Sequence, residues 1–92
     1  MEINFRKKIK NLELCPKQYL GDKESDSLNI CQWSEDESYK WVIASFKYDE
    51  KEDFFYIEEC CDRLDDENFN WSDFGYLVRL GRKYLQLMKE VG

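Results

Sequence analysis

The C-terminal quarter of the sequence carries a long apolar stripe at helical spacing, and this stripe constrains the fold more than any other feature. Asn70 can cap the start of such a helix and Gly92 its end. Gly81 interrupts the stripe, and because a mid-helix glycine costs about 1 kcal/mol against alanine, it predicts a close approach to another element. The stripe consists of Phe74, Leu77, Val78, Gly81, Tyr84, Leu85, Met88 and Val91.

A second apolar row on the same segment widens the predicted apolar face. It consists of Tyr76, Leu80 and Leu87. A helix that is apolar over more than one face is either buried on two sides or offers a contact surface. We therefore list this row as a candidate homodimer or partner face.

Three short runs rich in aromatic and β-branched residues precede this helix, at 28–33, 40–48 and 54–61. Each has the length of a strand, and the charged connectors 34–38 and 49–53 have the length of hairpin turns. An antiparallel meander is the simplest topology for such a pattern. In the second run, strict alternation predicts one face formed by Val42, Ala44, Phe46 and Tyr48, and the other by Trp41, Ile43, Ser45 and Lys47.

The N-terminal segment 2–14 is ambiguous, because its apolar residues fit both helical and strand spacing. We favour an extended strand that ends before Cys15-Pro16, since the residue before a proline is driven toward β geometry. The predicted fold class is therefore α+β. It is an antiparallel meander of three to four strands packed against a C-terminal helix, in a single acidic domain over residues 1–92.

The cysteines and the polar N-terminus bear on the compartment. Charged residues occur within the first eight positions with no apolar region after them, and the longest uncharged apolar stretch, 41–46, is too short to span a bilayer. We expect a cytoplasmic protein without membrane contact. The thiols are then expected to stay reduced and to serve as small core residues. They are Cys15, Cys31, Cys60 and Cys61.

The residues for standard catalytic chemistry are missing. The sequence has no histidine, which removes the commonest general base and metal ligand, and its four glycines are too scattered for a phosphate-binding loop. Residues 66–77 begin like a calcium loop, yet Trp71 stands where glycine is needed and Leu77 where glutamate is needed. We expect no enzyme activity, no catalytic residue, no metal and no cofactor.

Acidic side chains are the one abundant charged type. The net charge is −6, and residues 21–75 carry seventeen acidic against five basic side chains. These acids either keep a small domain soluble or form a binding surface. The candidate acidic surface comprises Glu35, Asp36, Glu37, Asp49, Glu50, Glu52, Asp53, Asp65, Asp66 and Glu67. Interleaved aromatic residues favour an interface, and they are Trp33, Tyr39, Tyr48 and Tyr56.

With these acid clusters, a high aromatic content and a meander followed by a helix, the chain resembles small phage-encoded inhibitors of host defence, notably anti-CRISPR proteins and DNA mimics. The resemblance implies a non-enzymatic inhibitor, acting in the host cytosol. It would block the basic nucleic-acid-binding site of a nuclease or CRISPR effector. Two alternatives stay open: an immunity protein for a nuclease toxin, or an accessory or assembly protein that binds through its C-terminal helix. We do not expect direct nucleic-acid binding, because the negative field of the acidic body opposes binding through the short basic segment 6–10.

Overall fold

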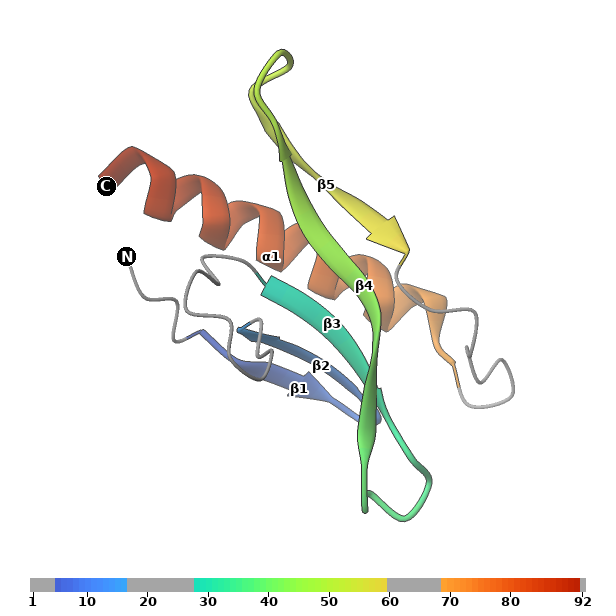
Figure 1. Ribbon diagram of the computed structural model, residues 1–92. Helices are drawn as coiled ribbons and strands as arrows, with labels where there is room; N and C mark the ends of the chain where they lie inside the picture. Colours follow the sequence, from blue (N-terminus) through green and yellow to red (C-terminus); the bar gives the residue numbers. More distant parts are fainter. Residues whose placement is uncertain (1–4, 17–27, 60–68, 92) are drawn as a thin grey trace, which may run out of the picture.

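A computed structural model describes residues 5–16, 28–59 and 69–91. Within these residues the chain forms five strands and one helix: β1 (Lys7–Ile9), β2 (Leu12–Pro16), β3 (Leu28–Trp33), β4 (Lys40–Asp49), β5 (Phe54–Glu59) and α1 (Trp71–Val91). Strands adjacent in sequence are neighbours in one sheet, and every pair is antiparallel. Figure 1 shows α1 crossing one face of this sheet. The predicted α+β meander with its C-terminal helix is confirmed.

The N-terminal segment differs in detail from the single strand that the sequence predicted. It forms two strands joined by a turn at Lys10 and Asn11, with Lys10 in the left-handed region at φ 53°. The strand also does not stop before Cys15, since β2 ends at Pro16, opposite Leu28. The preference of a residue before proline for β geometry extends the strand through Cys15 rather than ending it.

A β-bulge in β4 breaks the alternation that the sequence predicted. Ile30 pairs with Ala44 and Cys31 with Val42, so Ile43 is the extra residue on β4. Ile30 and Cys31 are consecutive and point to opposite faces, and their partners therefore do the same. The prediction that Val42 shares a face with Ala44 is wrong, because the bulge shifts the register between them.

The core lies between the sheet and α1. Its buried members are Leu12, Leu14, Leu28, Ile30, Ile43, Ala44, Phe46, Leu77 and Leu85. A methyl group built on Gly81 would overlap the ring of Phe46, which confirms the predicted close approach of the helix to the sheet. The predicted cap is confirmed as well, because Asn70 Oδ1 accepts hydrogen bonds from the backbone N–H groups of Ser72 and Asp73, at 2.9 and 3.2 Å.

The part of the chain that the structure describes holds no helix with both the length and the apolar character that a membrane crossing requires. Gly92, proposed as the C-terminal cap, and Cys60 and Cys61, at the end of the third predicted strand, lie outside the described ranges.

Candidate protein-binding surface

The part of the chain that the structure describes is almost neutral. The described residues include twelve acidic and eleven basic side chains. Most of the net charge of −6 therefore belongs to residues 1–4, 17–27 and 60–68, outside the described ranges. Among the described residues, negative charge is concentrated in particular turns and is not spread over the whole surface.

Two hairpin turns gather the acids that the sequence singled out. Residues 34–39, the first tip, join β3 to β4, and residues 49–54, the second tip, join β4 to β5. Because both flank the ten-residue strand β4, the tips lie at opposite ends of the sheet, as Figure 1 shows. At about 3.3 Å per residue, that strand separates them by roughly 30 Å. The predicted acids 65–67 lie outside the described residues.

Hydrogen bonds inside the first tip occupy one of its acids. Asp36 Oδ1 accepts from the hydroxyls of Ser38 at 2.7 Å and Ser34 at 2.8 Å, and from the backbone N–H of Ser38 at 3.1 Å. These bonds, led by that of the Ser38 hydroxyl, hold the pKa of Asp36 below its ordinary value. Glu37, at φ 58°, forms an ion pair with Lys8 of β1. Asp36 thus shapes the turn and Glu37 ties it to β1, while Glu35 is exposed.

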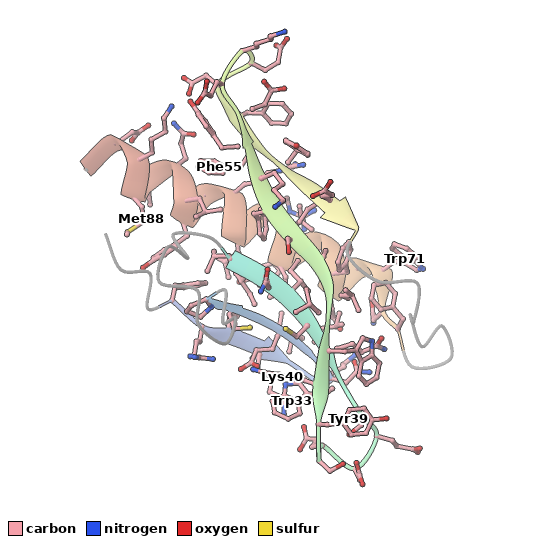
Figure 2. The ribbon with its side chains drawn as sticks, in the orientation of Figure 1. Trp33, Tyr39, Lys40, Phe55, Trp71 and Met88 are labelled. Carbon is pink, nitrogen blue, oxygen red and sulfur yellow. The ribbon has the colours of Figure 1, made fainter. Side chains whose placement is uncertain are left out.

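A cleft of about 380 Å³ opens between this tip and the β1–β2 turn. Its lining comprises Lys10, Asn11, Trp33, Ser34, Glu35, Asp36 and Glu37. The ammonium groups of Lys8 and Lys40 lie over the Trp33 ring, 5.1 and 5.2 Å from its centroid. Figure 2 shows Trp33, Tyr39 and Lys40 together at this end of β4. Trp33 is therefore held beside the acids by two cations, and its buried Nε1 finds no acceptor among the described residues.

A three-residue cluster fixes the second tip to the helix. The hydroxyl of Tyr48 and the ammonium of Lys89 both donate to Asp53 Oδ1, and Lys89 Nζ lies 4.4 Å from the centroid of the Tyr48 ring. Lys89, followed by Tyr48, lowers the pKa of Asp53, and Asp53 in turn raises the pKa of Lys89. This cluster joins the β4–β5 hairpin to the last turns of α1.

The other acids of the second tip divide into one that shapes the turn and two that are exposed. Asp49 Oδ1 accepts from the backbone N–H groups of Lys51 at 3.0 Å and Glu52 at 3.3 Å, as turn-forming aspartates commonly do. Glu50 and Glu52 are exposed. Together with Glu35 on the first tip, they are the acids of the two tips with the weakest structural role.

Exposed aromatic rings accompany both tips. Tyr39 is 54% exposed on the first tip and packs on Trp41 with ring centroids 5.6 Å apart. Near the second tip, Phe54 and Tyr56 are 43% and 37% exposed and their centroids lie 6.3 Å apart. The sequence analysis missed Phe54 as a surface residue, although its spacing of two from Tyr56 places both rings on one face of a strand.

The second apolar row of α1 is partly exposed. Tyr76 and Leu87 are 44% and 50% exposed, whereas Leu80 is more buried and packs against the core. Trp71, at the start of the helix, is the most exposed of the large apolar side chains described, at 65%, and the sequence analysis did not select it. The dimer or partner face stays a prediction, now centred on Tyr76 and Leu87.

The described ranges contain no group of three histidine, cysteine, aspartate or glutamate side chains arranged to hold a metal ion. Comparisons with protein-family models, curated proteins and solved structures find no match to this chain. Its function must therefore be argued from the surface itself, and the two acidic, aromatic tips are the feature that sequence and structure share.

Proposed function

We propose that this chain is a non-enzymatic inhibitor that binds the basic nucleic-acid-binding site of a nuclease or CRISPR effector through its two acidic tips. The observation that supports this proposal is their placement at opposite ends of one continuous strand, β4. Their separation of roughly 30 Å is close to the helical repeat of duplex DNA, about 34 Å. Two clusters so spaced can meet basic groups that contact phosphates one turn apart.

Charge screening determines how such tips act. At physiological salt the field of an exposed charge decays over about 8 Å. Each tip therefore engages its own basic cluster, and the strand between them sets the spacing. The exposed rings of Tyr39 and Phe54 add apolar contact beside the acids, which is the composition of a protein interface.

Pairing within the fold separates the acids that support the fold from those available to a partner. Glu37 and Asp53 are engaged by Lys8 and Lys89, and Asp36 and Asp49 accept hydrogen bonds from their own turns. Reversing any of these four changes the fold as well as the surface. Glu35, Glu50 and Glu52 are exposed and report on the surface alone, and we assign the recognition of a basic partner to these three.

The test begins with capture of partners on the tagged chain and elution in a salt gradient. The captured nuclease or other nucleic-acid-binding protein is then measured against a triple variant carrying Glu35→Lys, Glu50→Lys and Glu52→Lys. We expect at least a tenfold loss of affinity, about 1.4 kcal/mol, a weaker salt dependence and an unchanged thermal midpoint. Glu90→Lys, an exposed reversal near the end of α1, is the matched control and should bind normally.

Unchanged affinity of the triple variant would refute the role of the tips, as would a partner that stays bound at high salt. A salt-resistant partner, or capture of the chain by itself, would instead favour the exposed apolar residues of α1. Leu87→Glu, on a side chain that is 50% exposed, then tests that assembly role by size-exclusion chromatography. Leu80 is unsuitable for this purpose, because it packs against the core.

A further inference from the structure

Two cysteines meet on the sheet face turned away from the core. Cys15 of β2 pairs with Asn29, and Cys31 of β3 pairs with Glu13, so the two cysteines are diagonal neighbours across the β2–β3 ladder. Their Sγ atoms lie 3.6 Å apart, and the residues are 4% and 3% exposed. Both are free thiols. The predicted burial of these two cysteines is confirmed, but neither belongs to the core cluster beneath α1.

A small pocket of about 160 Å³ reaches this pair. Its lining comprises Cys15, Pro16, Asn29, Cys31, Lys40, Trp41 and Val42. At about 30 Å³ for each water molecule in the liquid, the volume matches a few waters. It has room for a small polar molecule. Lys40 brings a positive charge to the wall, where it is ion-paired to Glu13 at 2.8 Å.

The two thiols have pKa values shifted in opposite directions. The hydrogen bond from the Cys31 thiol lowers the pKa of Cys15 to about 7, against the opposing effect of burial. Lys40 and Arg6 make smaller contributions in the same direction, and Glu13 opposes them. The same hydrogen bond raises the pKa of Cys31. Near neutral pH, a substantial fraction of Cys15 is therefore thiolate, the nucleophilic form, while Cys31 keeps its proton.

We propose that Cys15 and Cys31 form a thiol oxidation site, at which a small hydroperoxide closes a disulfide between β2 and β3. The Cys15 thiolate attacks one peroxide oxygen, so that an S–O bond forms, the O–O bond breaks and hydroxide leaves with the electron pair. The Cys31 sulfur then attacks the Cys15 sulfenic acid and expels its hydroxyl group. With the Cys31 proton and the proton released by Cys15, both hydroxides become water. Two thiols and one hydrogen peroxide give one disulfide and two waters.

Closing the disulfide requires a local shift of β2 against β3, because diagonal neighbours in a sheet have Cα atoms about 7 to 8 Å apart, beyond the usual disulfide range of about 4.4 to 6.8 Å. The sulfur atoms, now 3.6 Å apart, must approach to about 2.05 Å, the length of a disulfide bond. The bond closes a loop between two strands that are already paired in the sheet. By restricting the unfolded chain, such a cross-link should raise the thermal midpoint by roughly 10 to 20 °C.

The test uses the full chain carrying Cys60→Ser and Cys61→Ser, which removes the two thiols outside the described residues. The chain is treated with hydrogen peroxide at pH 7.4, blocked with a maleimide and digested with trypsin. We expect a disulfide between the peptides 11–17 and 24–40, two hydrogen masses below the sum of the reduced peptides. The rise in thermal midpoint should accompany it, and dithiothreitol should reverse both.

Three comparisons separate this site from ordinary thiol oxidation. The reaction should slow as pH falls below 7, and it should slow in Lys40→Met, which removes the positive wall of the pocket. Cys31→Ala should leave a Cys15 sulfenic acid that dimedone traps.

The proposal is overturned if Cys15 and Cys31 stay reactive toward maleimide after peroxide treatment. An equal rate of cross-linking in the urea-unfolded chain also overturns it, since the folded arrangement would then contribute nothing. This second comparison needs no substitution at either cysteine, so the test does not depend on how well a cysteine variant folds.

Discussion

Replacing Gly81 by alanine tests the close contact between α1 and the sheet. The substitution gains about 1 kcal/mol of helix propensity. The added methyl group, however, overlaps the ring of Phe46, whose side chain is 2% exposed and surrounded by core residues. Overpacking of this kind costs about 1 to 3 kcal/mol. The net effect is a loss of about 1 kcal/mol, equivalent to a fall of about 4 to 8 °C in the thermal midpoint.

Gly75→Ala is the matched control in the same helix. A methyl group there meets only the guanidinium of Arg79, at 3.6 Å, which is ordinary contact. It should therefore stabilise the protein by up to about 1 kcal/mol. Urea unfolding followed by tryptophan fluorescence measures both variants. In a Phe46→Leu background, Gly81→Ala should lose its cost, because the shorter side chain leaves room. Equal stabilisation by Gly81→Ala and Gly75→Ala would refute the argument.

Three further predictions concern polar contacts. Asn70→Ala removes the helix cap and should cost about 1 kcal/mol in urea unfolding, whereas Asn70→Asp should retain most of it. Ser45→Ala removes the hydroxyl that donates to Asn29 Oδ1 at 2.8 Å in a buried site, and should cost about 1 to 3 kcal/mol. The third concerns Asp53, whose pKa is lowered in the folded chain. The ionised Asp53 therefore stabilises the fold fully above its unfolded pKa of about 3.9. This stabilisation disappears as the pH falls through the lower pKa of the folded chain. Thermal midpoints measured from pH 6 to pH 2 should therefore fall less steeply in Asp53→Asn; an identical profile would show that the contact with Lys89 is not maintained in solution.

Much of this fold could be predicted from local patterns in the sequence. The bounds of β3, both charged hairpin turns, the cap at Asn70 and the close approach at Gly81 all follow from side-chain spacing within a few residues. The bulge at Ile43 and the break between β1 and β2 could not be predicted from this spacing, because each depends on how a strand pairs with its neighbour. Lys10 adopts a left-handed turn conformation without the glycine that normally signals one.

The candidate surface was harder to predict, because charge counted along a sequence ignores which charges meet in space. Five of the described acids form ion pairs with other described residues, and several of these pairs join distant segments, such as Glu37 to Lys8 and Asp53 to Lys89. Part of the candidate acidic surface therefore serves to connect the hairpins to the rest of the fold. Apart from Glu90 on α1, the other exposed acids described lie at two separate ends of β4, which is why the proposed recognition depends on spacing rather than on total charge.

For the cysteines, burial could be predicted from the sequence, but the contact between them could not. Burial of Cys15 and Cys31 followed from the usual behaviour of free thiols, and the structure confirms it. Their contact does not follow from composition, because it needs the register that sets Cys15 opposite Asn29 and Cys31 opposite Glu13. A shift of one residue in that pairing would turn one strand's side chains to the other face and separate the two sulfur atoms. The same register brings Lys40, through β3–β4 pairing, to the wall of the pocket, so the thiol pair and its nearby cation arise together from the order of the meander.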